Sequence, residues 1–296
     1  SYNTYPWSMQ WFKGKLYDGT NRAATCAAMA TADAALGSST YPTADPELHC
    51  TEDPRDLPLR AEIWRYTPET RQWDRVYQSP EDVPIEFDEN GEPTRFTARD
   101  MGYRDMIVFE ENAAPGSDRA RRGMPGVQRL YVAGVSASSL FDTHPGYSGG
   151  ERRYPPPRIL WTADGITWNA VPQKPGTFMG DIGTRDTVVK ERGFRSFAAV
   201  RAASGENQLY VTLTDLKGVG RILMSTRPSR GNDAWRTVSP EADELPIYTI
   251  HEFEHQLYAT ATLGTLDEPT GYGIFKTDGV TPDPQDESRL SFVPAV

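Results

Sequence analysis

One pattern recurs four times along this chain of 296 residues: an aromatic or β-branched residue, a short turn, the pair Leu-Tyr and a strand of small residues. The four copies occupy residues 11–20, 108–135, 200–214 and 253–262. A repeated unit that cannot cover both of its own faces must stack on its neighbours. An internal repeat therefore constrains the fold more tightly than any single motif does.

Each copy is followed by a second pair of short strands, at 61–80, 158–173, 221–240 and 272–296. Every strand alternates or runs apolar for about five residues and is bounded by turn residues. Four-stranded antiparallel units in series are typical of a β-propeller. The sequence therefore predicts an all-β fold, a single propeller domain of four-stranded antiparallel blades, with four recognisable blades at about 7–80, 103–175, 193–240 and 247–296.

Composition agrees with many short strands joined by turns. The chain has 24 Pro and 25 Gly, which interrupt long helices, and 11% aromatic residues, which suit strands. Its formal net charge is −10, and an acidic surface repels phosphate backbones, so we expect no nucleic-acid partner. No apolar run approaches the roughly 20 residues that a transmembrane helix needs, so we expect no transmembrane segment.

The two cysteines of the chain, Cys26 and Cys50, bracket one segment. Two isolated cysteines that flank a single loop favour a local disulfide, and a disulfide favours a secreted, extracellular or periplasmic protein. Two unrelated buried thiols are the alternative. The segment belongs to an insertion at about 21–60 in the first blade. Its Ala-rich first part predicts a short helix, and its Pro- and Asp-rich remainder predicts a loop that the disulfide ties down.

Three short stretches resemble the repeats of known propeller families. Residues 64–73, WRYTPETRQW, resemble the kelch pattern of a strand, a Pro-containing turn and a Trp that opens the outer strand. Residues 162–168, TADGITW, resemble the Asp-box of sialidase-like propellers but are one residue short, and residues 276–282, KTDGVTP, resemble it more weakly. The whole chain resembles uncharacterised exported bacterial propeller proteins, which implies a fold and export but no known activity.

The Asp-box-like stretch has a physical rationale. We expect Asp164 to accept hydrogen bonds from backbone amides of the turn, Gly165 to take a positive φ and Trp168 to pack beneath the turn. This device shapes a hairpin on the outer rim of a propeller, so we assign it a structural role. Sialidase chemistry also needs an arginine triad, a Tyr nucleophile and an acid, which the Asp-box does not imply.

A second repeat, Gly-aromatic-Arg, ends at Arg104 and Arg195, where the chain crosses to the innermost strand of the next blade. Counted back from the Leu-Tyr pair, Trp7 and Tyr248 occupy the corresponding positions of the first and fourth blades. Innermost strands line a propeller's channel, so the four residues predict a binding ring at its mouth, suited to a carboxylate, a sulfate or a sugar face. The alternative is that each Arg pairs with a neighbouring acid and only pins two blades together.

Residues 251–255, HEFEH, have the His-Glu-x-x-His spacing of zinc proteases. That motif requires a helix, because only a period of 3.6 residues places two histidines four apart beside one metal. The repeat instead puts His251 on the innermost strand of the fourth blade and His255 in the following turn, so we expect no zinc site. His251 and Glu252 are candidate ligand-binding residues near the axis. We predict no cofactor, with Ca²⁺ left open because oxygen-rich turns can hold it.

No recognisable catalytic set accompanies the repeat, since no Ser lies in a strand–turn–helix elbow. The sequence favours an exported, non-enzymatic binding or scaffold module that recognises a glycan or a protein through one propeller face. The alternative is a glycan-active hydrolase or lyase with its site at the mouth of the channel, which the ring of Arg and aromatic residues keeps open. Closures of more than four blades are commoner, so we expect further blades or partner chains to complete the ring.

Overall fold

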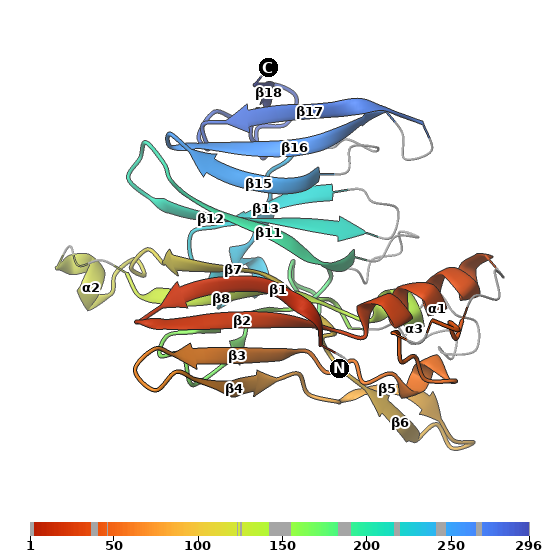
Figure 1. The fold of residues 1–296 in the computed structure, drawn as a ribbon. Helices are drawn as coiled ribbons and strands as arrows, with labels where there is room; N and C mark the ends of the chain where they lie inside the picture. The colour runs from red at the N-terminus through yellow and green to blue at the C-terminus, as the bar shows by residue number, and fades with distance from the viewer. Residues whose placement is uncertain are drawn as a thin grey trace.

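The structure is a computed structural model. It describes residues 3–36, 41–45, 47–122, 124, 126–141, 155–182, 191–215, 220–240, 247–264 and 268–295. Figure 1 shows successive β-sheets with helices at the margins. The helices are α1 (Ala24–Leu36), α2 (Asp118–Arg121) and α3 (Ser138–Phe141). Among the described helices, none has the length and apolar character that crossing a bilayer requires.

The main strands form four blades in chain order. Blade 1 contains β1 (Asn3–Phe12), β2 (Lys15–Arg22), β3 (Glu62–Thr67) and β4 (Gln72–Gln78). Blade 2 contains β7 (Gly102–Glu110), β8 (Gln128–Val135), β9 (Ile159–Thr162) and β10 (Asn169–Ala170). Blade 3 contains β11 (Glu191–Arg201), β12 (Asn207–Asp215), β13 (Gly220–Ser225) and β14 (Arg236–Thr237). Blade 4 contains β15 (Ile247–Phe253), β16 (Gln256–Gly264), β17 (Pro269–Thr277) and β18 (Val293–Pro294).

Within each blade, every strand pairs antiparallel with the next. The predicted all-β propeller of four-stranded antiparallel blades is therefore confirmed. Single backbone pairs also link neighbouring blades, Asn21 with Gly102 and Val135 with Gly193. These links lie where the chain enters the inner strands β7 and β11, so they set the position of each new blade against the previous one.

The Leu-Tyr pair gives each blade two different faces. Successive side chains of a strand point to opposite faces, so the Leu packs against the preceding blade, on what we call the leading face. The Tyr packs against the following blade, on the trailing face. The pairs that share a buried cluster are Tyr17 with Leu130, Tyr131 with Leu209, and Tyr210 with Leu257. Each of these six side chains is at most 1% exposed, so the repeat builds the cores between the blades.

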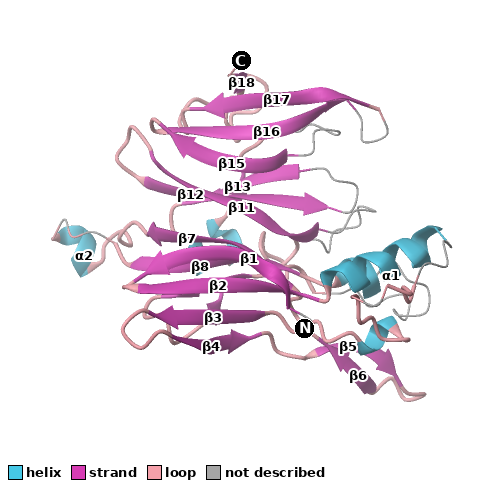
Figure 2. Cartoon of the chain, viewed as in Figure 1, coloured by secondary structure: helices cyan, strands magenta, loops and turns pink. Residues whose placement is uncertain are grey.

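The insertion in blade 1 and the connection to blade 2 form a small cap at one end of the strands (Figure 2). Helix α1 packs against α3 and beside the short 3₁₀ turn η1 (Pro54–Asp56). A hairpin of β5 (Val83–Phe87) and β6 (Pro93–Thr97) completes the cap, and the sequence pattern did not predict it. Apolar residues of α1, α3 and β5 share one buried cluster, which gives the cap a core of its own.

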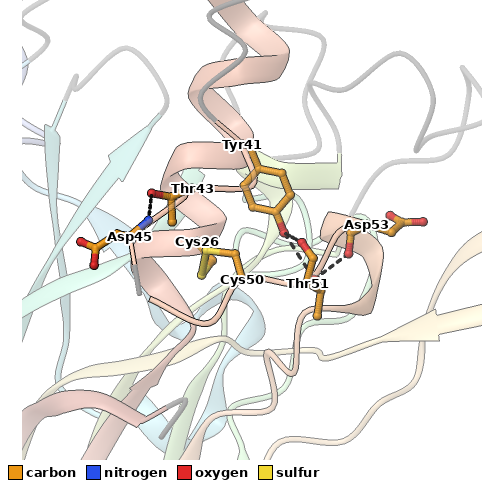
Figure 3. Close-up of a disulfide and its surroundings, with 7 residues drawn as sticks. All are labelled: Cys26, Tyr41, Thr43, Asp45, Cys50, Thr51 and Asp53. Atoms are coloured by element: carbon orange, nitrogen blue, oxygen red, sulfur yellow. Dashed lines mark hydrogen bonds between the residues drawn. A yellow bond between two sulfur atoms is a disulfide. The ribbon is translucent and has the colours of Figure 1, made fainter. Parts of the chain in front are cut away.

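Cys26 of α1 and Cys50 form the predicted disulfide, with their Cα atoms 5.5 Å apart (Figure 3). Hydrogen bonds order the same loop. The Tyr41 hydroxyl donates to the carbonyl oxygen of Thr51 at 2.8 Å, and the Thr51 hydroxyl donates to the carbonyl oxygen of Asp53 at 2.7 Å. The insertion is therefore tied to its own helix covalently and ordered internally by polar contacts.

Two matching turns follow β9 and β17. Asp164 Oδ1 accepts hydrogen bonds from the amides two and three residues later, at 2.8 and 2.7 Å, and Asp278 Oδ1 does the same at 2.9 and 2.7 Å. Gly165 has φ 78°, and a Cβ on it would lie 1.9 Å from the Tyr17 hydroxyl. That hydroxyl donates to the Gly165 carbonyl at 3.3 Å. The glycine is thus required both by the backbone and by the close approach of blade 1.

Candidate binding site on the inner strands

The inner strand of every blade contains a β-bulge, and each predicted ring residue lies at one. In β1 the register shifts between Pro6 and Ser8, which places Trp7 at the shift. The corresponding shifts in β7, β11 and β15 fall at Arg104, at Arg195 with Ser196, and at Tyr248. A bulge re-aims a side chain away from the regular alternation of a strand. The four residues are therefore equivalent in the fold although their types differ.

The other two residues of the Gly-aromatic-Arg repeat hold the inner strands in place. A Cβ on Gly102 would lie 2.5 Å from the Trp7 ring, and one on Gly193 would lie 2.8 Å from the Val135 side chain. Only glycine allows these approaches. The aromatic residues that follow, Tyr103 and Phe194, are fully buried. The Gly and the aromatic residue of the repeat thus fix the strand, and the Arg that follows them lies at the bulge.

Two ring residues from different blades are in direct contact. The Cζ atom of Arg104 lies 4.8 Å from the centroid of the Trp7 ring, within the range of a cation–π interaction. Both side chains are partly exposed, and so is that of Arg195 at the equivalent position of blade 3. Tyr248 holds the fourth position in the backbone of β15. Asp100, four residues before Arg104, forms an ion pair with Arg158.

In blades 1 to 3, the residue that follows the ring residue joins its blade to the next one through a hydrogen bond. The three bonds are Ser8 Oγ to the Tyr103 carbonyl at 2.8 Å, the Phe197 amide to Asp105 Oδ2 at 2.6 Å, and the Ile250 amide to Ser196 Oγ at 3.4 Å. Each bond joins the inner strand of one blade to the inner strand of the next blade. The bulges therefore lie directly beside the polar seam that holds the inner strands together.

Asp105 is the acidic member of this seam. Burial raises the pKa of its carboxyl group, while hydrogen bonds from the amides of Phe197 and Met106, together with the charge of His251, act in the opposite direction. Burial wins, because the net shift is upward. A carboxyl group with a raised pKa, beside Arg104 in sequence, holds a proton more readily than an ordinary Asp does. The inner strands therefore combine cations, an aromatic ring and a protonatable acid.

The two residues proposed from the HEFEH stretch have different surroundings. His251 and Glu252 are both exposed on β15, and His251 is close enough to influence the pKa of Asp105. Glu252 Oε1 instead accepts a hydrogen bond at 2.8 Å from the amide of His255. His255 has φ 61° in the turn after the strand, as the repeat predicted. Of the pair, His251 is the residue associated with the inner-strand site.

Within the described ranges, no three His, Cys, Asp or Glu side chains gather as a metal site requires. His251 and His255 lie on a strand and in a turn, so they do not share the helical face that a zinc protease motif uses. The turn carboxylates are engaged with backbone amides, as at Asp164.

Asp105 was not among the predicted ring residues, although the sequence contained the signal for it. Aligned on the bulge, the following position is Ser8 in blade 1, Ser196 in blade 3 and Thr249 in blade 4. Blade 2 alone replaces a hydroxyl with a carboxyl group. A repeat position that carries a hydroxyl group in three blades and a carboxyl group in the fourth marks that residue as a candidate site residue. Extending the alignment one residue past Arg104 would have identified Asp105.

No protein-family model matches the chain, and no curated protein matches it in sequence. Solved structures with a similar fold include a protein of unknown function from Dyadobacter fermentans DSM 18053, at 12% identity, TM-score 0.44, 98% of this chain and 64% of that chain. They also include an α-L-arabinofuranosidase from Clostridium thermocellum ATCC 27405, at 6% identity and TM-score 0.42, with 97% of this chain and 70% of that chain covered. A family 117 glycoside hydrolase produced by Zobellia galactanivorans is similar at 13% identity and TM-score 0.40, with 98% of this chain and 68% of that chain covered. The chain spans about two thirds of their length, and likeness of this degree carries no conclusion about activity.

Proposed function

We propose that the inner-strand bulges bind an acidic glycan, a carbohydrate that bears carboxylate or sulfate groups. The contact between Arg104 and the Trp7 ring, 4.8 Å from Cζ to the ring centroid, carries the proposal. Arg195 places a second guanidinium at the equivalent bulge of the adjacent blade. A guanidinium binds a carboxylate or a sulfate through paired hydrogen bonds, and an aromatic ring offers a flat apolar surface to a sugar.

Pre-organisation supports the same proposal. Arg104 is attached to a strand that Gly102 and the buried Tyr103 hold in place, and its guanidinium already rests on Trp7. Groups fixed before binding lose less conformational entropy when a ligand arrives. Tyr248, at the fourth bulge, is proposed as a further aromatic contact on the same site.

The Cys26–Cys50 disulfide supports export, because such bonds form and persist in oxidising compartments. Glycans with many carboxylate or sulfate groups are encountered outside cells or in the periplasm. We therefore propose a secreted, extracellular or periplasmic location, in agreement with a glycan ligand.

Calorimetric titration with defined oligosaccharides tests the binding proposal. We expect oligogalacturonate or a heparin oligosaccharide to bind, and a neutral cello-oligosaccharide of equal length to bind more weakly. The double variant Arg104→Met/Arg195→Met should raise Kd at least about a hundredfold, because each charged hydrogen bond contributes about 1.5–3 kcal/mol. The matched control Arg121→Met/Arg122→Met removes the same charge from exposed positions outside the inner strands and should leave Kd unchanged. Equal binding by both double variants would refute the site.

A glycan hydrolase or lyase is the second candidate, and Asp105 is the observation that favours it. Its raised pKa suits a general acid, which must keep its proton until the leaving group takes it. Glycoside hydrolysis needs a second carboxyl group across the scissile bond. Glu252, exposed on inner strand β15 of blade 4, is the proposed partner from the predicted set, and this role would require release of its hydrogen bond with the His255 amide.

Product analysis separates the two candidates. Incubation of the oligosaccharide that binds best, followed by chromatography, should show shorter products only if the site is catalytic. In that case Asp105→Asn should abolish turnover while binding persists, since an amide oxygen can still accept the bond from Phe197. If the bound oligosaccharide is recovered intact, the chain is a binding module at this site.

A further inference from the structure

Among the described residues, blades 1 and 4 each have one face without a neighbouring blade. The inner strands pack in chain order, β1 on β7, β7 on β11 and β11 on β15. No comparable packing joins β15 back to β1 among the described residues. In Figure 1 blade 1 and blade 4 lie at opposite ends of the molecule. The leading face of blade 1 and the trailing face of blade 4 are therefore the two faces that no blade of the described residues covers, and we call them the open faces.

The trailing face of blade 4 repeats a surface that is buried in the other blades. Phe253 and Tyr258 meet edge to face with their ring centroids 6.2 Å apart, and the equivalent Phe–Tyr pairs of blades 1 and 2 lie at 6.2 and 6.3 Å. In those blades the next blade covers the phenylalanine, so Phe12 and Phe109 are 2% and 3% exposed. Phe253 is 60% exposed.

The same face continues over β17. Tyr272 and Ile274 pair directly with Thr262 and Thr260 of β16, so they lie on the same side of the sheet as Tyr258. Tyr272 is 82% exposed and Ile274 is 43% exposed. Exposed apolar side chains that continue over several strands mark an interaction surface.

The leading face of blade 1 shows the same mismatch. Met9 occupies the position of Met106 in blade 2, whose methyl carbon approaches Gly19 of the preceding blade. Met106 is 4% exposed, whereas Met9 is 52% exposed. Trp11, which pairs with Leu16, is 54% exposed. Leu16 itself is partly exposed, although the Leu of every other Leu-Tyr pair is fully buried.

The two open faces are the two halves of one interface. Every buried junction brings the Tyr of a trailing face into the same cluster as the Leu of a leading face. Leu16 and Tyr258 are the two members of the repeat that no junction between the described blades uses. A surface that fits the trailing face of blade 4 is therefore present in the chain itself, on blade 1.

We propose that a second copy of this chain covers these faces head to tail. The trailing face of blade 4 in one copy packs on the leading face of blade 1 in the other, as the successive blades of one chain do. Such an interface is heterologous, because it joins two different surfaces. Two copies form a closed ring when each supplies both contacts, and longer assemblies form when the rotation does not close.

Sedimentation velocity tests the assembly. The purified chain should sediment with a mass of two chains, or a larger whole multiple, and the population should shift toward one chain on dilution. Met9→Glu/Trp11→Glu and Phe253→Glu/Tyr272→Glu should each lower the apparent association constant at least a hundredfold, with an unchanged far-ultraviolet circular dichroism spectrum. The control Phe96→Glu/Ile166→Glu replaces two exposed apolar residues outside both faces and should assemble like the parent chain.

Mixing the two variants tests the head-to-tail arrangement. Each variant retains the face that the other has lost, so an equimolar mixture should contain pairs of one copy of each, held by the single intact interface. A symmetric contact between like faces would give no such mixed pair with restored mass. That result, or a parent chain that stays at the mass of one copy up to its solubility limit, would overturn the proposal.

A cross-linking experiment remains decisive if the charged variants fail to fold. Both native cysteines are in the disulfide, so single cysteines can be introduced as Leu16→Cys in one sample and Tyr258→Cys in another. With a short bismaleimide, the mixture should give cross-linked dimers, and each variant alone should give few. Equal yields from Leu16→Cys alone, or from an Ile166→Cys control, would contradict the head-to-tail contact.

Discussion

The two ends of strand β7 are anchored by buried carboxylates in different ways. Asp100, just before the strand, is fully buried and binds Arg158, while Tyr103 donates to it at 3.1 Å. The backbone amide of Asp100 also donates to the hydroxyl oxygen of Ser79 in blade 1 at 2.8 Å. It therefore ties blade 2 back to blade 1, with one cation as its main partner.

Glu111, just after β7, is shared among more donors. It binds Arg129, accepts from the Tyr131 hydroxyl at 2.6 Å, and accepts from the amide and hydroxyl of Ser229 at 2.6 and 2.9 Å. Ser229 belongs to blade 3, so this end ties blade 2 forward. The strand that carries Arg104 and Asp105 is thus fixed at both ends, which holds the candidate site in place. The Asp100 anchor therefore relies mainly on one ion pair, whereas the Glu111 anchor combines an ion pair with hydrogen bonds from two blades.

Arg158→Met should break the Asp100 anchor with the largest effect. Removal of one partner from a buried ion pair leaves an uncompensated charge, which costs about 3–5 kcal/mol. We expect the free energy of unfolding, from urea titration, to fall by that amount. The double variant Asp100→Asn/Arg158→Met removes the charge as well and should recover part of the loss. A single variant within about 0.5 kcal/mol of the parent chain would show that the ion pair does not anchor β7.

Paired phenol deletions compare the two anchors directly. Tyr131→Phe removes a 2.6 Å hydrogen bond to Glu111, and Tyr103→Phe removes a 3.1 Å bond to Asp100. Burial, and then the neighbouring carboxylate, raise the pKa of both hydroxyls, so both remain donors at neutral pH. We expect a loss of about 2 kcal/mol for Tyr131→Phe and about 1 kcal/mol for Tyr103→Phe. The reverse order in urea titrations would show that bond length does not rank these contacts.

Repeats and local motifs could be predicted from the sequence because their partners are near or periodic. The Leu-Tyr pairs gave the blades, two cysteines gave the disulfide, and the bonds of Asp164 reach amides only two and three residues away. The β5–β6 hairpin was missed because Val83 and Ile85 are few apolar residues among Pro and acidic neighbours. Their burial depends on the cap that packs on them.

The polar partners of the anchors could not be predicted at all. Asp100 and Arg158 are 58 residues apart, and nothing in the repeat assigns a buried carboxylate to one arginine among many. The ring positions were found by counting from the repeat, yet the contact of Arg104 with Trp7 depends on how far two blades approach each other. Periodicity predicts equivalent positions, whereas packing decides which equivalent residues touch.

A third carboxyl group, that of Asp18 on β2, differs from both anchors because its Oδ1 atom is buried without a hydrogen-bond partner. Burial raises the pKa of Asp18 from 3.8 to about 6. The unfolded chain ionises this group near pH 3.8 and the folded chain only near pH 6. Its destabilising contribution is therefore absent below about pH 3.8, grows between the two values and is complete above about pH 6.

Asp18→Asn should accordingly stabilise the chain at pH 7 by about 1 kcal/mol, after allowance for solvent screening of a partly exposed group. The gain should disappear below about pH 4. Thermal unfolding on the Phe253→Glu/Tyr272→Glu background avoids any contribution from assembly. Asp164→Asn is the matched control with the opposite sign, because backbone amides of Ile166 and Thr167 hold the pKa of Asp164 well below its usual range. It should destabilise the chain at pH 7, and the difference should shrink as the pH falls. The same sign for both variants would mean that hydrogen-bond partners do not separate these carboxyl groups.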